Sequence, residues 1–480
     1  MADRPDAPRE LTLRALVLGA GLGVAFAASS VYLGLKVGLT VSASIPIAVL
    51  SITVFRALGR SSIHENNIVQ TTGSAGESIA AGVAFTLPSL LLMGFDLEVA
   101  KTTWIALLGG LLGVLMMIPL RRGLVVRERD RLPYPEGTAC AQVLLAGERG
   151  GVSARTVFAG LGAGGLFGLL GGLGRFFGDV ASWSLGRWLP GASFAIEPNA
   201  ALLGVGWVVG TRVALVMLGG GLLSYWVLIP AVHLFGPDQT SPLVGGGAIA
   251  VRDMAPGQVR NAFVLYVGAG AVAAGGLVTL LRSLPSIAAA FREGVRAVDA
   301  AGDARARTDR DLPMRLVLGG ALALVVAIAA APGLGVDTPT AALVVLFGFF
   351  FVTVSSRITG EIGSSSNPIS GMTVATLLAT CLLFAAVGRT GVGYKPMALA
   401  TAALVCVAAA NGGTTSQDLK TGYLVGATPR AQQIAILVGA LASALALGPI
   451  LLRLNEAATV YVPQTPGSIR CAMRPSSPTR

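Results

Sequence analysis

The sequence has 480 residues, of which 53% are hydrophobic and only 12% are charged, and its formal net charge is +11. Soluble globular proteins carry about 25% charged residues, so the composition excludes an ordinary soluble protein and indicates a membrane protein. The arginines stand in short polar stretches between apolar runs and are not interleaved with aromatic residues, which argues against a nucleic-acid partner.

The chain begins with ten polar residues of mixed charge that do not resemble a cleaved signal peptide. Apolar runs follow, and a spanning helix needs roughly 20 mostly apolar residues. About a dozen runs qualify, at residues 16–33, 39–55, 78–94, 103–120, 157–173, 213–235, 262–281, 316–331, 341–354, 372–387, 397–410 and 434–451. The pattern predicts an all-α polytopic protein of the cell membrane with about 12 or more transmembrane helices.

The glycines bear on how the predicted helices pack, and the arginines bear on which loops face the cytoplasm. Many of the 64 glycines lie inside the apolar runs, where they allow two helices to approach closely and would also permit a homodimer. Five arginines lie between residues 121 and 131, two more are Arg56 and Arg60, and seven lie between residues 282 and 315. These basic stretches predict loops that face the cytoplasm.

The longest polar stretch divides the chain into two apolar parts. It opens with Ile287, Phe291, Val295 and Val298 at helical spacing, which predicts an amphipathic helix on the cytoplasmic membrane surface. We therefore divide the chain into an N-terminal tail (1–14), a first transmembrane half (15–283), the linker (284–314), a second transmembrane half (315–455) and a polar tail (456–480).

The two halves share an order of small, polar segments. Aligned without gaps, residues 73–79 lie over residues 363–369, and each half has a further polar segment, at 134–139 and 411–416. Paired broken segments in two halves are typical of a transporter site at the interface of an internal repeat. We therefore predict re-entrant or broken helices that hold a polar solute.

The first polar segment, residues 66–77, leads directly into an apolar run. The amides and hydroxyl of Asn67, Gln70 and Ser74 could coordinate a zwitterionic or carboxylate-bearing solute. Glu77 could take up a proton, because burial disfavours a charged carboxylate. The alternative is a plain loop in which Ser74 caps a helix that begins near Glu77.

The second segment, residues 134–142, contains Pro135 and Glu136. Proline is favoured at the first position of a helix and an acid in its first turn. Glu136 is therefore either an ordinary N-terminal acid or a substrate or proton site.

The third segment, residues 359–371, lies between two strong apolar runs and contains Asn367. Its near-absence of charge favours a re-entrant segment over a plain loop. The fourth, residues 411–422, contains Asn411, Thr414, Asp418 and Lys420. The last two could form a switching ion pair in a cavity or be solvated charges of a surface loop.

Together the four segments resemble the signature of the oligopeptide transporter (OPT) family, which includes the yellow-stripe-like metal-chelate carriers. The matching motifs are NNIVQTTGSAGESIAAG (66–82), YPEGTACAQVL (134–144), TGEIGSSSNPISGMT (359–373) and NGGTTSQDLKTGYLVGATPRAQQ (411–433). They come in the family's order, and the resemblance runs from about Leu11 to Leu452.

The resemblance implies a secondary carrier, usually proton-coupled, that imports small peptides or metal complexes of peptide-like chelators. It implies an all-helical bundle with internal pseudo-symmetry and short re-entrant helices. The substrate-binding residues expected from it, with Asn67 added from its chemistry, are Asn67, Gln70, Ser74, Asn367, Asn411 and Thr414. The expected proton-coupling residues are Glu77, Glu136, Asp418 and Lys420. Family members usually continue with further spans, so we expect the second half to be truncated.

Two other functions use the same residues. A membrane-embedded enzyme would need a base beside a nucleophile such as Ser74, and none of the four segments contains histidine. A channel could be lined by the same polar backbone. Neither the four cysteines nor the two histidines are spaced for a metal site, so no cofactor is expected.

Overall fold

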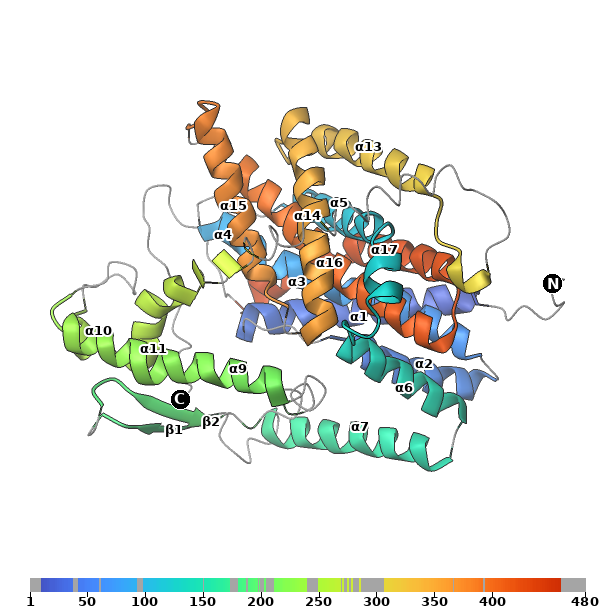
Figure 1. Ribbon diagram of the computed structural model, residues 1–480, viewed down its shortest axis with the longest axis horizontal. Helices are drawn as coiled ribbons and strands as arrows, with labels where there is room; N and C mark the ends of the chain where they lie inside the picture. Colours follow the sequence, from blue (N-terminus) through green and yellow to red (C-terminus); the bar gives the residue numbers. More distant parts are fainter. Residues whose placement is uncertain are drawn as a thin grey trace.

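The computed structural model describes residues 10–458 apart from 38–41, 60–61, 93–97, 150, 173–179, 187–188, 240–248, 366, 392, most of 197–210 and most of 269–305. Over these residues the chain is almost entirely helical, and most of its long helices gather into one bundle, with α7 (Gly151–Gly172) and α9 (Thr211–Leu222) beside it (Figure 1). The N-terminal tail before residue 10, the amphipathic helix expected at residues 287–298 and the tail after residue 458 lie outside the described residues.

The bundle is formed by α1 (Leu13–Val37), α2 (Ser44–Leu58), α3 (Ile63–Thr86), α4 (Pro88–Leu92), α5 (Val99–Met117), η1 (Arg122–Arg127), α6 (Pro135–Arg149), α13 (Met314–Ala330), α14 (Thr338–Ile362), α15 (Ile369–Ala386), α16 (Tyr394–Val425) and α17 (Pro429–Ala458). The remaining elements are α7 (Gly151–Gly172), β1 (Ala181–Ser184), β2 (Ser193–Ile196), α9 (Thr211–Leu222), η2 (Leu223–Leu228), α10 (Ile229–Phe235), η3 (Val251–Asp253), α11 (Pro256–Val259), η4 (Arg260–Val264) and η5 (Arg307–Asp309).

Eight helices in the described part of the chain are long and apolar enough to cross a membrane. They correspond to eight of the predicted runs, and the all-α polytopic class is confirmed. The run at 39–55 forms only the 15-residue α2, whereas the run at 78–94 is the second half of α3 followed by α4. The division of the chain into two transmembrane halves stays a prediction.

Helices α3 and α16 occupy the centre of the bundle, where α1, α5, α14 and α17 pack around them. Nearly all of α3 and most of α16 are buried, polar residues included. Glycines make this packing possible: a Cβ at Gly73 would lie 3.2 Å from the Gly19 carbonyl oxygen, and one at Gly412 would lie 2.6 Å from the Val352 side chain. The polar segments at residues 66–77 and 411–422 are thus tightly enclosed by other helices.

Two of the predicted breaks are wrong. Residues 66–77 lie inside the uninterrupted α3, which begins after the N-cap Ser62, and residues 411–422 lie inside the uninterrupted α16. A helix satisfies its own backbone donors and acceptors, which an irregular segment at this depth cannot do, and neighbouring helices pair the polar side chains. The gapless alignment therefore places a helix (73–79) over a loop (363–368), and the internal repeat stays a prediction.

The other two segments break as predicted. Helix α6 begins at Pro135. Helix α14 ends at Ile362, and Gly363 then adopts φ +89°, a left-handed conformation that favours glycine. Helix α15 begins only at Ile369.

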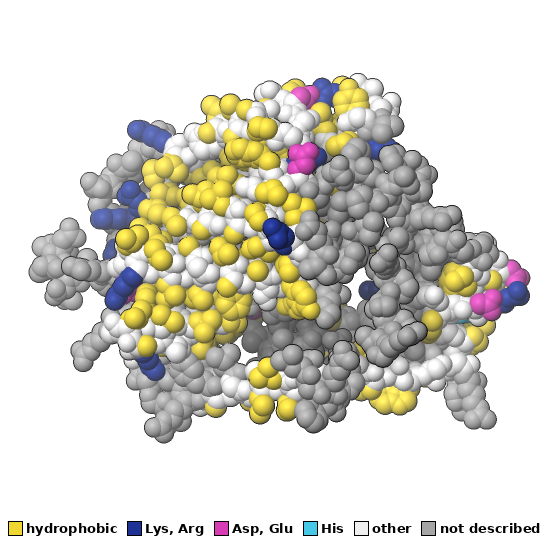
Figure 2. All heavy atoms as spheres, turned by 180° about the vertical axis from the view of Figure 1, so that it is seen from behind, with side chains coloured by type: hydrophobic (Ala, Val, Ile, Leu, Met, Phe, Trp, Pro, Cys, Tyr) yellow, Lys and Arg dark blue, Asp and Glu magenta, His cyan; other side chains and the backbone are white. Residues whose placement is uncertain are grey.

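Ionic contacts gather at one end of the bundle. Arg14 pairs with Glu65 at the start of α3, and Arg121 pairs with Asp311. Arg307 donates to the Gly426 carbonyl in the turn between α16 and α17. We call the end that carries Arg14, Arg56, Arg121, Arg129 and Arg307 the basic end. Figure 2 shows a broad apolar face with most of its Arg and Lys side chains along one edge.

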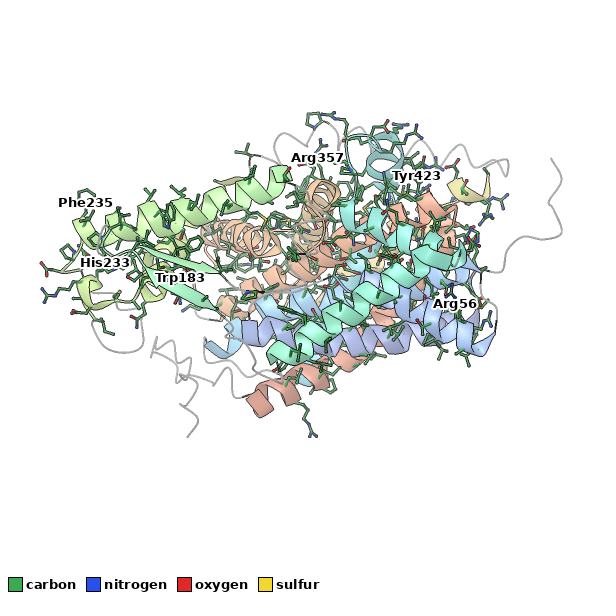
Figure 3. All side chains as sticks on the ribbon, turned by 90° about the horizontal axis from the view of Figure 1, so that it is seen from below. Arg56, Trp183, His233, Phe235, Arg357 and Tyr423 are labelled. Atoms are coloured by element: carbon green, nitrogen blue, oxygen red, sulfur yellow. The ribbon has the colours of Figure 1, made fainter. Side chains whose placement is uncertain are left out.

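The elements from η2 to η4 have a small core of their own around Ile229, Val251, Met254 and Val259. Strands β1 and β2 pair antiparallel, with Ala181 opposite Ile196. No strand was expected from the sequence. Figure 3 shows Trp183, His233 and Phe235 at one end of the molecule and Arg56 at the other.

Candidate functional site

Asp418 lies at the centre of a buried hydrogen-bond network between α3 and α16. Its Oδ1 accepts from Gln70 Nε2 at 2.5 Å and from Ser44 Oγ at 3.4 Å, and its Oδ2 accepts from Ser74 Oγ. The side chain is 1% exposed. Three donors from α2 and α3 therefore surround an acid on α16, because Gln70 and Ser74 are one helical turn apart on the same face of α3.

Two more amides extend this network. Asn67 lies one turn before Gln70 on α3, and its Nδ2 donates to Gln70 Oε1 at 3.2 Å. Asn67 was also among the substrate-binding residues predicted from the sequence. Gln432, in the first turn of α17, donates from Nε2 to the Asp418 carbonyl oxygen at 2.8 Å and to Thr71 Oγ1 at 3.2 Å. Its neighbour Gln433 reaches in another direction, to Asp311 Oδ1 at 2.8 Å.

Glu77 is buried two turns after Gln70 on α3. It accepts a hydrogen bond from the Ala43 backbone amide at the start of α2, and its Oε2 has no hydrogen-bond partner. Asp418 and Glu136 both lie close enough to act electrostatically on it. Three buried acids from α3, α6 and α16 thus lie around the first turn of α2.

Glu136 occupies the first turn of α6 and reaches the break between α14 and α15. Its Oε2 accepts from the Ser364 hydroxyl at 2.6 Å and from the Ser364 amide at 3.2 Å. Its Oε1 accepts from the Ser365 amide at 3.1 Å. A carboxylate that accepts three hydrogen bonds from one loop fixes that loop, so Glu136 has a structural contact besides its place near Glu77.

The predicted residues Asn411, on α16, and Asn367, in the loop before α15, make contacts away from Asp418. Asn411 accepts from Ser78 Oγ at 2.8 Å and donates to the Gly110 carbonyl oxygen at 2.8 Å, and so connects α16 to α3 and α5. Asn367 donates to Ser355 Oγ at 2.7 Å, beside α14. Thr414 is buried on α16 between these contacts and Asp418.

Lys420 does not pair with Asp418. Its Nζ donates to the backbone carbonyls of Arg129 and Leu132 at 3.3 and 3.4 Å and lies 5.8 Å from the centre of the Tyr134 ring. Residues two apart on a helix do not face each other, so the ion pair considered from the sequence does not form. Lys420 instead binds the turn that precedes α6.

The site is rich in hydrogen-bond acceptors. Around the three acids, the buried oxygens that have no partner include Asn67 Oδ1, Glu77 Oε2, Asn367 Oδ1, Gln417 Oε1 and Gln432 Oε1. None of the three buried acids forms an ion pair with a described residue. The described residues also include no group of three or more His, Cys, Asp or Glu side chains that could hold a metal ion. The arrangement suits protons and N–H donors.

Sequence reasoning missed several residues of this network, namely Ser44, Ser78, Ser364, Ser365 and Gln432. Ser44 and Ser78 are single small polar residues at the start of a helix or inside one, where a local backbone contact is the usual explanation. Ser364 and Ser365 lie in the loop between α14 and α15, inside the third polar segment, where nothing distinguished them from the other polar residues of that segment. The pair Gln432-Gln433 offered a signal, because two uncharged amides directly precede a long apolar run.

Two comparisons with known proteins agree. A family model described as "OPT oligopeptide transporter protein" matches residues 10–473. A relative from Haemophilus influenzae (strain ATCC 51907 / DSM 11121 / KW20 / Rd), named "Putative oligopeptide transporter", is 34% identical over 452 residues. The match covers 88% of this chain and 69% of the relative.

Proposed function

We propose, on the premise that this chain belongs to the oligopeptide transporter (OPT) family, that it is a proton-coupled carrier of small peptides in which Glu77, Asp418 and Glu136 handle the proton. Family membership itself makes the chain a multi-pass membrane transporter and not an enzyme, so those predictions are confirmed. Proton coupling, the individual site residues and a wider substrate range belong to the proposal.

The observation that supports the proposal most is the position of Glu77. Its Oε2 has no partner although the residue is only 6% exposed, and an unpaired anion inside a membrane protein is costly. Asp418, by contrast, has three side-chain donors. We therefore expect Glu77 to hold a proton when the site is empty and to release it toward the other acids during transport.

The unpartnered acceptors suggest how a peptide is recognised. A peptide offers an ammonium group and backbone N–H donors, which match the oxygens of Asn67, Asn367 and Gln432. Gln70 and Ser74 now donate to Asp418 and are the donors for which a peptide carboxylate would compete. Metal complexes of peptide-like chelators carry the same groups and fall within the proposed range. The homodimer expected from the glycine-rich faces stays a prediction.

Uptake into liposomes tests the proton role. The purified protein is reconstituted into liposomes, the outside is made more acidic than the lumen, and entry of radiolabelled trialanine is followed. We expect the gradient to accelerate uptake for the unchanged protein and for the control Glu98→Gln, whose side chain lies outside the network, but not for Glu77→Gln.

Three results would contradict the proposal. Gradient-driven uptake that survives Glu77→Gln removes the proton role of that residue. Uptake that does not saturate with peptide concentration favours a channel. Uptake that ignores the gradient in every variant removes proton coupling altogether.

A further inference from the structure

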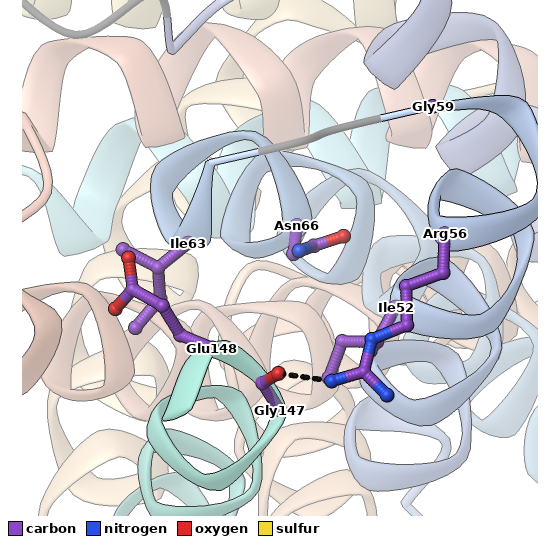
Figure 4. A pocket seen from close by; sticks show the side chains of 7 residues that line it. All are labelled: Ile52, Arg56, Gly59, Ile63, Asn66, Gly147 and Glu148. Atoms are coloured by element: carbon purple, nitrogen blue, oxygen red, sulfur yellow. Dashed lines mark hydrogen bonds between the residues drawn. The ribbon is translucent and has the colours of Figure 1, made fainter. Parts of the chain in front are cut away.

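An open cleft of about 410 Å³ lies at the basic end, among the ends of α2, α3 and α6 (Figure 4). Its volume falls in the range of about 300–1,000 Å³ that is typical of small-ligand sites. The lining residues are Ile52, Arg56, Gly59, Ile63, Asn66, Gly147 and Glu148. None of them was assigned a function above.

The three helices around the cleft also lead to the buried acids. Helix α2 starts at Ser44, which donates to Asp418, and reaches the cleft at Ile52 and Arg56. Helix α6 starts beside Glu136 and reaches the cleft at Gly147. These two helices run side by side in the same direction. Cys140 contacts Ser44 near their starts, and Gly147 contacts Ile52 further along both helices.

Helix α3 runs the other way and carries polar side chains from the cleft to the site. Asn66, Gln70 and Ser74 are spaced four residues apart, so they share one face, and Glu77 follows three residues later. Glu77 lies eleven positions after Asn66, which corresponds to roughly 16 Å along the helix axis. The cleft and the acid site are thus the two ends of one polar helix face.

The cleft has opposite charges on two of its walls. Arg56, from α2, donates from Nη2 to the Gly147 carbonyl oxygen at 2.5 Å, and Glu148 follows directly on α6. Both side chains are exposed, whereas Asn66 is buried below them, as are Ile52 and Ile63. The Arg56 guanidinium complements a carboxylate, and the Glu148 carboxylate complements an ammonium group. The cleft therefore suits a short zwitterion that carries a carboxylate at one end and an ammonium at the other, above the amide of Asn66 and the apolar walls.

We propose that this cleft is the cytoplasmic vestibule of the carrier, in which a short zwitterionic peptide binds by its two charged termini between Arg56 and Glu148. The cytoplasmic side follows from the arginines of the basic end. The inference rests on the proposed function, because it takes peptides as the cargo. The cleft, the shared face of α3 and the opposite charges of Arg56 and Glu148 support it independently of any proton role.

Thiol labelling tests the vestibule. In a Cys381→Ser, Cys471→Ser background, Asn66→Cys and Glu148→Cys each place a thiol in the cleft. Asp130→Cys, next to Arg129 at the basic end and with a side chain that is 88% exposed, provides a control outside the cleft. Vesicles of known orientation are treated with a membrane-impermeant maleimide. We expect both cleft thiols to react from the cytoplasmic side, and saturating trialanine to slow them about tenfold without slowing the control.

Uptake measurements test the charges. In inside-out vesicles, which present the cytoplasmic face to the added peptide, Arg56→Ala and Glu148→Gln should each raise the trialanine concentration for half-maximal uptake about tenfold. This is the usual effect of losing a charged hydrogen bond. N-acetylated trialanine amide, which lacks both charges, should show no difference between variants, and the exposed Arg252→Ala should behave as the unchanged protein.

The outcomes separate the two proposals. Cleft thiols that react only from the opposite side, or that peptide does not protect, overturn the vestibule. Charge variants that affect the capped and free peptides equally overturn recognition of the termini. Peptide protection that persists while uptake ignores the pH gradient supports the vestibule and removes only the proton coupling.

Discussion

Helix α3 and the segment from β1 to η4 place their polar and apolar residues in opposite ways. In α3, Asn67, Gln70 and Ser74 have no exposed surface at all. In the β1–η4 segment, large apolar side chains face outward, and Phe235 is 89% exposed. Buried polar residues are the informative exception in any protein. In a bilayer, exposed apolar residues need no explanation, so the buried polar helices are where function is to be sought.

The largest effect expected from this comparison is at Asp418. Asp418→Ala leaves the donors of Gln70 and Ser74 buried without an acceptor, and we expect it to destabilise the protein by about 2–5 kcal/mol and to abolish uptake. Asp238→Ala is the matched control, because Asp238 and its partner Arg252 are 83% and 65% exposed. Its cost should stay within about 0.5 kcal/mol. Thermal unfolding in detergent measures both, and equal losses would remove the distinction between the regions.

Glycine substitutions should produce a smaller difference of the same kind. A Cβ at Gly76 would lie 2.6 Å from Ser443 Oγ, with the Gly23 backbone even closer, so Gly76→Ala should cost about 1–3 kcal/mol. A Cβ at Gly164 in α7 meets nothing within 4 Å. Gly164→Ala should therefore be neutral or stabilise by a few tenths of a kcal/mol. The difference in Tm between the two variants is the measurement, and a tolerated Gly76→Ala would contradict the close packing of α1 and α3.

The smallest effect concerns an ion pair at the ends of two spans. Asp337 caps α14 and pairs with Arg389 at 2.7 Å. Partial burial raises the pKa of Asp337, but the hydrogen bonds from Thr340 and Arg389 and the charge of Arg389 outweigh it and lower the pKa below its ordinary value. A lowered carboxyl pKa stabilises the fold above the unfolded-state pKa of about 3.9, and this contribution is lost as the pH falls through the folded-state pKa.

Asp337→Asn retains a capping oxygen and loses only the ion pair, so at pH 7 it should cost less than about 1 kcal/mol. The difference in unfolding temperature between the variant and the unchanged protein should shrink below about pH 4. A difference that grows in acid would show that Asp337 acts in another way.

Much of the bundle could be predicted from the sequence, because spans reveal themselves by apolar length and helix starts by residues such as Pro135. The continuous helices at 66–77 and 411–422 could not. Glycine, asparagine and threonine are poor helix formers in water. Once these segments are buried among other helices, a helix is the conformation that satisfies their backbone hydrogen bonds. The candidate acids Glu77 and Asp418 were identifiable by charge alone. Ser44 and Gln432 were not, since their importance depends on contacts between distant helices.

Gln432 and Gln433 have a consequence for how the transporter responds as a whole. One amide contacts the Asp418 backbone in the interior, and the next contacts Asp311, which pairs with Arg121 at the basic end. Both belong to a single turn of α17, so a displacement of that turn alters the two contacts together. Coupling between sites is reciprocal in free energy. If a solute bound near Asp418 changes the stability of the Arg121–Asp311 ion pair, then a change in that ion pair alters the affinity for the solute by the same free energy.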